Sequence, residues 1–425
     1  MAAPVNLSPC PSVLTKEEKS VFYHSFCFAL IQVRRAFRPL LFAFHRIGQP
    51  QKGKAMEIDS RLIGVYRSVG GAIQAASAYS MERIPRTDPL TGVRILQLTS
   101  YPVLSHTLYY HCPSITPDSK TLVFMTYNRP GRFSTPDAWR VNLDGTEIRP
   151  VTNREGLAGF VISPDGKTVY CQQGGTLLAA PMENSPTGSI AHEVASIPDV
   201  VIGATLLGSI TADGKWYIST AFLTDGRTAL VRYATDGSEA RVLKIAEYLV
   251  HVQVDQSDAG RILYVAPPDE KGRSMWVTDC DGENPRTLNL RHSTGHFVWF
   301  GKTGRLLSTV NDPFGSVVSI AEGEDEPQLI AKGGHFWHAA GSQDGKWVVS
   351  DTNWPDIGLI LINTETGLWA PLCKAEASEG HPQWTHPHPM FAPDGRRVVF
   401  NSDRTGIGQI YTVEIPESLR QQLSG

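Results

Sequence analysis

Residues 163–173 read SPDGKTVYCQQ, a tight turn followed by a short run rich in β-forming residues, and variants of this phrase recur along the chain. Asp-Gly between such runs is a hairpin signal, because the turn needs residues that tolerate a positive φ. The other copies begin at Thr116, Thr211, Gln256, Phe300, Ser342 and Ala392. Their turns, at Asp118, Asp165, Asp213, Asp258, Thr303, Asp344 and Asp394, are 47, 48, 45, 45, 41 and 50 residues apart.

A second turn lies inside several of these repeats, at Asp144, Asp236 and Asp281. Two hairpins per repeat make a four-stranded unit, and seven units at this period predict an all-β fold, a seven-bladed β-propeller of four-stranded antiparallel blades. The β-branched composition and the frequent glycine turns exclude a stack of helical repeats. The last blade lacks a strand, and we expect Arg94–Thr99 (RILQLT) to fill the gap and close the ring.

The propeller is predicted over residues 90–416, followed by a short C-terminal tail at 417–425. Residues 1–55 differ in composition and are expected to form a weakly ordered N-terminal extension, and residues 56–89 a partly helical lead-in. Ser20–Val33 is apolar but too short to span a bilayer, and its acidic-containing flank fits a secretory signal poorly. A membrane-surface helix or an organellar presequence stays open for this segment, but we expect no membrane partner.

Charge and cysteine content narrow the class of protein. The 39 Lys and Arg against 42 Asp and Glu give a net charge of −3 without long runs of either sign, which does not suggest nucleic-acid binding. The six cysteines are scattered and form no CxxC pair, so neither a disulfide framework nor a zinc ribbon is indicated. A reducing, cytoplasmic location is the expectation.

The stretch Gln383-Trp-Thr-His386-Pro-His388-Pro concentrates metal-binding side chains. Imidazole is the commonest protein ligand for transition metals, and in an extended segment His386 and His388 project from the same side. The prolines should hold both histidines near β or polyproline conformation. The segment therefore predicts half of a metal site, the alternative being a Pro-rich turn with surface histidines.

Further histidines occupy similar places in their repeats. His338 and His388 lie six residues before their turns, His251 and His296 seven, and His106 twelve. Equivalent positions in propeller blades point to the same rim of the central channel, so these imidazoles should converge. For each histidine alone, a hydrogen-bonded structural role is the alternative.

The segment HPQWTHPHPMFAPDGRRVVFNSD (His381–Asp403) resembles the signature of the oligogalacturonate lyases, polysaccharide lyase family 22. Further similarity in SHTLYYHCPSITPDSKTLVF, TGHFVWFGKTG and WHAAGSQDGKWVVSDTN extends the resemblance over residues 94–416. It implies a seven-bladed propeller that cleaves short uronic-acid oligomers by β-elimination with bound manganese. It also implies metal ligands at His338, Gln383, His386 and His388, and a proton-abstracting base at His296.

Two departures from the family pattern bear on the substrate. The family arginine near the substrate carboxylate corresponds most closely to Arg273, which is displaced by one residue and would change faces in a strand. Tyr264–Asp269 replaces a Cys-His-Glu-Gly-Pro-like segment. His106 and His251 are interpreted as contacts to sugar hydroxyls, with structural roles as the alternative.

The leading hypothesis is a metal-dependent lyase acting on a small uronic-acid oligosaccharide. A lyase for another uronide, such as a glucuronate-containing saccharide, and a non-catalytic propeller with a structural metal are the alternatives. The residue types permit Mn²⁺, Fe²⁺, Co²⁺ or Zn²⁺, and the resemblance favours a divalent metal of the Mn²⁺ kind. Assembly as a homodimer stays open.

Overall fold

The computed structural model describes residues 82–127, 135–183, 191–197, 201–257, 260–290, 292–352, 356–380 and 384–425. The expected N-terminal extension (1–55) and most of the lead-in (56–81) lie outside these ranges. Each repeated phrase lies at the connection between the first two strands of a sheet. In the second repeat the Ser163 hydroxyl and the Lys167 backbone N–H donate to Asp165 Oδ1 at 2.6 and 3.0 Å, and Gly166 takes a φ of 73°. The aspartate thus closes the turn with its side chain, and the glycine supplies the left-handed backbone.

Six of the repeats fold into four-stranded antiparallel sheets, the blades of a propeller. Blade 1 consists of β3 (Ser105–Thr107), β4 (Thr121–Thr126), β5 (Asp137–Asn142) and β6 (Arg149–Pro150). Blade 2 consists of β7 (Ala158–Ile162), β8 (Thr168–Gln173), β9 (Thr176–Pro181) and β10 (His192–Ser196). Blade 3 consists of β11 (Val201–Ile210), β12 (Trp216–Leu223), β13 (Thr228–Ala234) and β14 (Ala240–Ala246).

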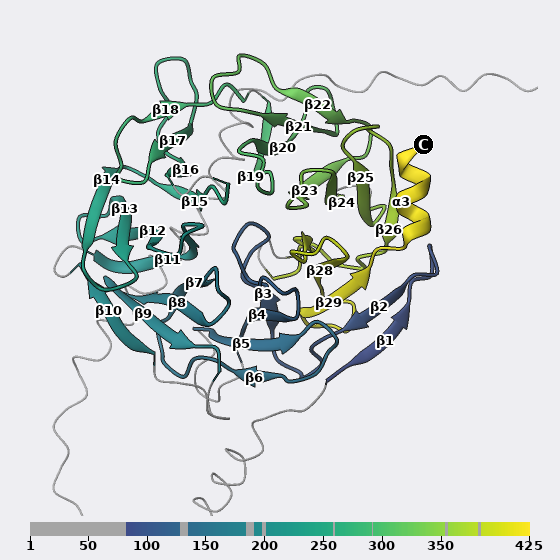
Figure 1. Cartoon of the computed structure of the whole chain (residues 1–425), viewed down its shortest axis with the longest axis horizontal. Helices are drawn as coiled ribbons and strands as arrows, with labels where there is room; N and C mark the ends of the chain where they lie inside the picture. Colours follow the sequence, from purple (N-terminus) through teal and green to yellow (C-terminus); the bar gives the residue numbers. More distant parts are fainter. Residues whose placement is uncertain are drawn as a thin grey trace, which may run out of the picture. The chain divides into compact units, whose positions relative to one another are not determined.

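The next three blades repeat this plan. Blade 4 consists of β15 (Val250–Val254), β16 (Arg261–Val265), β17 (Met275–Asp279) and β18 (Arg286–Thr287). Blade 5 consists of β19 (Ser293–Trp299), β20 (Leu306–Val310), β21 (Ser316–Ile320) and β22 (Gln328–Ala331). Blade 6 consists of β23 (Phe336–Gly341), β24 (Trp347–Thr352), β25 (Leu359–Asn363) and β26 (Trp369–Cys373). The first strand of each blade lies nearest the centre of the ring and the fourth at its periphery (Figure 1).

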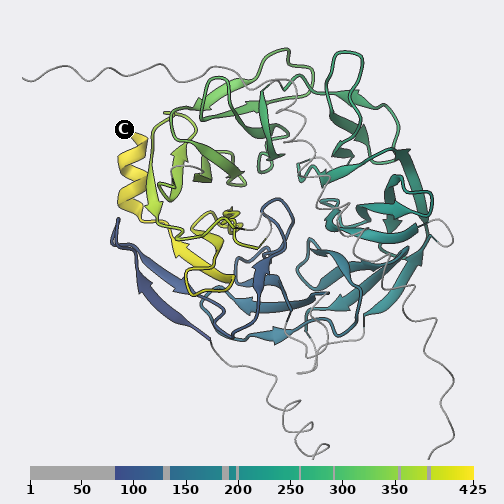
Figure 2. The same ribbon diagram turned by 180° about the vertical axis from the view of Figure 1, so that it is seen from behind.

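The seventh blade is built from both ends of the described chain. β27 (Met390–Phe391), β28 (Arg397–Ser402) and β29 (Gln409–Glu414) are joined by β2 (Arg94–Gln97), which pairs with β29 and so closes the ring as predicted from RILQLT. The purple strands of the start lie against the yellow strands of the end in Figure 1 and in the reverse view of Figure 2. The seven-bladed fold is therefore confirmed.

Two elements were not predicted. β1 (Ile84–Thr87) pairs with β2 and makes this last sheet five-stranded, so the end of the expected lead-in is a strand. The expected tail carries a helix, α3 (Glu417–Ser424), which packs against β25 and β26. No helix in the described part of the chain has the length and apolar character needed to cross a membrane.

Large aromatic side chains fill the space between neighbouring blades. The Tyr217 hydroxyl of blade 3 donates to the Gly159 carbonyl of blade 2 at 2.6 Å, and Tyr233 does the same to Gly175 at 2.9 Å. Gly159 has a φ of 65°, and a Cβ added there would lie 2.3 Å from the Tyr217 hydroxyl oxygen. A glycine is therefore required both by the backbone and by the packing of this junction.

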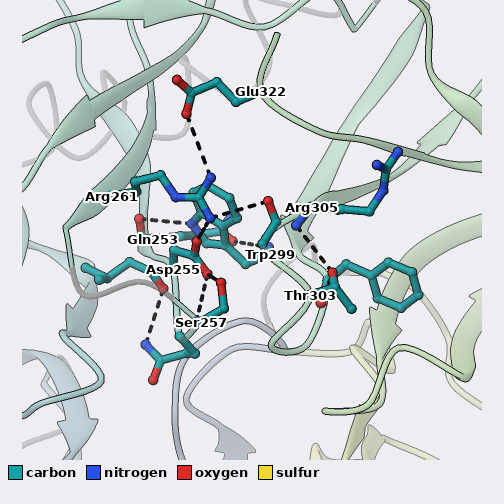
Figure 3. Close-up of polar contacts among 12 residues, drawn as sticks. Gln253, Asp255, Ser257, Arg261, Trp299, Thr303, Arg305 and Glu322 are labelled. Atoms are coloured by element: carbon teal, nitrogen blue, oxygen red, sulfur yellow. Dashed lines mark hydrogen bonds and ion pairs between the residues drawn. The ribbon is translucent and has the colours of Figure 1, made fainter. Parts of the chain in front are cut away.

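Blades 4 and 5 are joined by polar contacts instead. The Gln253 side-chain amide donates to the Phe297 carbonyl at 2.9 Å, and the Arg261 guanidinium stacks 4.9 Å from the Trp299 ring centre. Figure 3 shows Arg261 between Asp255, with which it forms an ion pair, and Glu322, 3.8 Å away. Because Asp255 is fully buried, this arginine balances a carboxylate inside the fold.

Candidate metal and substrate site

The innermost strands of several blades carry a β-bulge near their start, and three histidines, His251, His296 and His338, lie in these bulges. In β23, Trp337 and His338 stand opposite the single residue Asp351. His251 lies in the corresponding irregularity of β15, and His296 in that of β19. A bulge redirects side chains locally, which is why such irregularities occur beside active sites. The regular placement of histidines before the turns therefore reflects a recurring backbone feature.

The bulges lie at the face of the ring away from the Asp-Gly turns. Val250 at the start of β15 pairs with Val265 at the end of β16, whereas the repeat turn joins the other ends of these strands. The six residues that separate His338 from Asp344 correspond to about 20 Å of extended chain. The turns therefore set the position of the histidines along the strand but take no part in the site.

Three histidines from blades 6 and 7 form a cluster able to bind a metal. One ring nitrogen from each of His338, His386 and His388 lies within 4.8 Å of the others. The ring centres of His338 and His388 are 4.2 Å apart, and His386 lies 5.4 and 5.6 Å from them. His338 and His388 are buried, and His386 is partly exposed. Gln383, the fourth expected ligand, lies outside the described residues.

Asp351 ties this cluster together. Its Oδ1 accepts the backbone N–H of His338 at 2.6 Å, and its Oδ2 accepts the backbone N–H of His388 at 3.3 Å. The same Oδ2 lies 2.8 Å from Nδ1 of the His338 ring, within hydrogen-bond distance. Burial raises the pKa of Asp351 to about 7, while these donors and the nearby His386 act in the opposite direction. A carboxylate behind a ligating imidazole is the usual arrangement at protein metal sites.

The donor set fits a divalent transition metal. Burial holds the pKa of His338 and of His388 well below the usual range, and neighbouring imidazoles add to the effect, so both rings are neutral with a lone pair to offer. Three neutral imidazoles would leave most of an ion's positive charge available to a further ligand, because ligands of this type do not cancel it. Asp351 supplies a carboxylate that contacts His338 from behind rather than joining the three histidines as a fourth ligand.

The backbone around His388 differs from the expectation for a residue before proline. Its φ is 45°, in the left-handed region, so the prediction of a β or polyproline conformation was wrong at this residue. The bond from His388 N–H to Asp351 and that from Asn401 N–H to the Pro387 carbonyl, 2.8 Å, hold the segment in this turn. Tertiary contacts thus overrule the local preference.

His296 lies next to the cluster in a different environment. Its ring centre is 4.3 Å from that of His338 and 4.6 Å from that of Trp337. Its Nδ1 is buried and has no hydrogen-bond partner among the described residues. Burial, together with the imidazoles of His338, His251 and His386, holds the pKa of His296 well below its usual value. This ring is neutral and lacks the orienting carboxylate that His338 has.

An insertion in blade 1 packs against the cluster. Tyr109 and Tyr110 follow β3 in a segment that accounts for the longer distance from His106 to its turn. The Tyr110 ring stacks on His388, with centres 5.8 Å apart and planes within 6°, and also contacts His338 at 5.3 Å. Tyr109 contacts His388 at 4.7 Å. Both tyrosines are buried, so they form an apolar support beneath the ligands.

The two histidines expected to contact sugar lie around this centre. His251 has a φ of 55°, and burial lowers its pKa to about 4. It contributes to the lowered pKa of His338, as His106 does for His388. His106 is buried, with Nδ1 2.8 Å from the Thr107 carbonyl and its ring stacked with Tyr127. The structure therefore places both imidazoles within electrostatic range of the cluster, each also engaged in local packing.

Arg273 is held by a neighbour. It lies in the connection between β16 and β17, and its Nε and Nη2 donate to Asp269 Oδ2 at 2.8 and 2.7 Å. This pairing lowers the pKa of Asp269. The connection follows the end of β16, so it belongs to the same face of the ring as His251. Any bond to a substrate carboxylate would have to use the other edge of the guanidinium or displace Asp269.

Asp351 and Tyr110 were missed in the sequence. The signal for Asp351 was its place at the end of the second strand of its repeat, where blades 3 and 5 have Thr220 and Thr309. Each of these residues stands opposite a bulge. A carboxylate in a buried position that holds threonine in other blades indicates a role beyond packing. The equivalence of these positions becomes visible only once the bulge opposite them is known.

The fold and the site define a class: a β-propeller with a cluster of three histidines, able to hold a metal ion, at one end of its innermost strands. No family model matches the sequence. The chain is 24% identical over 386 residues to an oligogalacturonate lyase of Dickeya dadantii (strain 3937), which covers 79% of this chain and 96% of the relative. It is 22% identical over 378 residues to an oligogalacturonide lyase of Pectobacterium atrosepticum, covering 78% and 96%.

Solved structures agree with this relationship at the level of the fold. A structure described as oligogalacturonate lyase in complex with manganese superposes with a TM-score of 0.69 at 20% identity, covering 80% of this chain and 98% of the other. An oligogalacturonate lyase from Vibrio parahaemolyticus gives 0.68 at 20% identity, covering 80% and 99%. The chain is therefore similar in sequence to oligogalacturonate lyases and shares their fold, in agreement with the resemblance found in its sequence motifs.

Proposed function

We propose that this protein is a metal-dependent lyase that cleaves short oligogalacturonate-like uronides by β-elimination. The names of its relatives support the reaction class, and the manganese complex of a structural relative supports Mn²⁺ as the ion. The observation that carries the proposal is the contrast between two adjacent imidazoles. His338 is fixed by a carboxylate, as a ligand would be, and His296 beside it is neutral and unanchored, as a base would be.

In this mechanism His338, His386 and His388, with Gln383, would hold the ion. The bound ion would supply positive charge to offset the negative charge that develops on the uronate during proton removal. His296 accepts the C5 proton, the C5–H electrons form the C4–C5 double bond, and the C4–O bond breaks as the departing oxygen takes up a proton from water. A neutral imidazole is suited to this step at neutral pH.

The remaining expected residues keep proposed roles in binding. His106 and His251 would contact sugar hydroxyls, and Arg273 a uronate carboxylate through the edge of its guanidinium that does not face Asp269. Because Arg273 is tied to Asp269 in a segment that departs from the family pattern, a glucuronate-containing saccharide is the second candidate substrate.

The test is an elimination assay. The purified protein is incubated with Mn²⁺ and either digalacturonate or a glucuronate-containing disaccharide, and unsaturated product is followed near 235 nm. We expect product from one of them, and a loss of two to four orders of magnitude in His296→Ala, the range typical of a general base. Absence of product with every uronide would leave a non-catalytic propeller as the better explanation. Unchanged metal content in His338→Ala would refute the ligand assignment.

A further inference from the structure

Asp351 makes three hydrogen bonds that join two blades at the metal cluster. Two come from the backbone N–H groups of His338 in blade 6 and His388 in blade 7, and the third joins Asp351 Oδ2 to Nδ1 of the His338 ring. The residue is 2% exposed. A carboxylate this deeply buried is costly unless its oxygens are fully used, so its presence calls for a reason beyond packing.

The bond to the ring decides which nitrogen of His338 carries the proton. A neutral imidazole has one N–H and one lone pair, whereas an ionised carboxylate can only accept. With the proton on Nδ1, the lone pair of His338 is on Nε2 and available to an ion. The same carboxylate, through the backbone of His388, fixes the distance between ligands that come from different blades.

Other blades show that a carboxylate is not needed to support a bulge. In blade 5 the Thr309 hydroxyl bonds the Thr294 hydroxyl at 2.6 Å and the Trp337 carbonyl at 2.8 Å. In blade 3 Thr220 bonds Thr205 at 2.8 Å. A threonine therefore performs the structural task, and blade 6 has an aspartate where the bulge carries a ligand histidine.

We infer that Asp351 is a positioning residue of the metal site, which sets the His338 tautomer and the spacing of His338 from His388. The inference rests on the proposed function for the identity of the ion. It goes beyond that function because it assigns to Asp351 a contribution to metal affinity. This contribution comes from the bond to the His338 ring, and the backbone bonds of Asp351 alone would not provide it.

The test uses two variants and one control. Asp351→Asn can still accept the His338 backbone N–H, but it presents an amide N–H₂ to the ring and so favours the proton on Nε2. Asp351→Thr introduces the threonine that blades 3 and 5 have at this position, and those blades fold with it. The control Thr220→Val removes the equivalent hydroxyl bond in blade 3, away from the ligands.

Mn²⁺ affinity is measured by titration calorimetry without substrate, and the His338 tautomer by NMR of the metal-free protein with ¹⁵N-labelled histidine. We expect Asp351→Asn and Asp351→Thr to bind Mn²⁺ 10–100-fold more weakly, the usual effect of losing such a partner. Asp351→Asn should also move the proton to Nε2, and Thr220→Val should leave affinity within twofold.

An unchanged tautomer in Asp351→Asn, or an equal loss of affinity in Thr220→Val, would overturn the inference. Failure of the proposed function gives a different result. If the wild type binds Mn²⁺ but cleaves no uronide, the function is wrong while the variants still decide the role of Asp351. If the wild type binds no Mn²⁺, the metal assignment is wrong, and the proton on Nε2 in the wild type would also refute the tautomer argument.

Discussion

Replacing His296 by leucine should abolish catalysis without destabilising the protein. The ring is 9% exposed, and its Nδ1 is buried with no hydrogen-bond partner among the described residues. A buried polar atom without a partner costs about 1–3 kcal/mol, and leucine of similar size removes that cost. Allowing about 1 kcal/mol for imperfect packing, the free energy of unfolding should stay equal or rise by up to about 2 kcal/mol.

The matched control is the same substitution at His338. There the ring is hydrogen-bonded to the buried carboxyl group of Asp351 at 2.8 Å, and leaving a buried polar group without its partner costs about 1–3 kcal/mol. The two adjacent histidines should thus respond in opposite directions. Urea unfolding followed by tryptophan fluorescence measures stability, since the chain has nine tryptophans, and absorbance near 235 nm measures elimination.

The expected result for His296→Leu is a rate lower by about two to four orders of magnitude in a protein at least as stable as the wild type. A structural imidazole would give the reverse: a clear loss of stability with activity retained. That outcome would refute the assignment of His296 as the base and leave it as a packing residue beside Trp337.

Three further predictions concern the ion and the blade junctions. Removing Mn²⁺ with a chelator should lower the free energy of unfolding by about 2.7 kcal/mol when the starting concentration was 100 times the dissociation constant, and readdition should restore it. Gly159→Ala should cost roughly 2–4 kcal/mol in urea unfolding, from the left-handed backbone and the displaced Tyr217 hydroxyl; a smaller loss would mean that this junction yields easily. Arg261→Ala should cost about 3–5 kcal/mol because buried Asp255 loses its cation, with elimination activity retained; lost activity in a folded variant would contradict the separation of this junction from the site.

The ring was predictable because its evidence is periodic. Each blade needs a tight first turn, so the Asp-Gly phrases gave the number of blades, and the missing last strand identified Arg94–Thr99 as its complement. β1 gave no such signal, because Ile84–Thr87 is a short, mostly exposed edge strand with little apolar alternation. β1 takes its position by pairing with β2, and this pairing depends on the tertiary structure rather than on a local sequence pattern.

Most residues of the candidate site could be predicted from the sequence, but the backbone geometry and the contacts that hold them could not. The spacing of His338 and His388 from their turns indicated convergence, and the structure brings both together with His386. The bulges could not be predicted, because these short strands carry no sequence pattern that marks the position of an inserted residue. The left-handed His388 and the contribution of Asp351 follow from contacts between blades, which a local pattern does not encode.

The pairing of β2 with β29 has a consequence for the order of events during synthesis. The two strands are more than 300 residues apart in the chain, and their pairing completes the seventh blade. The segment that carries His386 and His388 leads directly into the first strand of this blade. We expect this pairing to form late in folding, because closing so long a loop costs chain entropy before the contacts of the closed ring can offset that cost. A ribosome-bound chain can therefore fold six blades and His338 before the last blade supplies His386 and His388, so the three-histidine cluster is completed only as the ring closes.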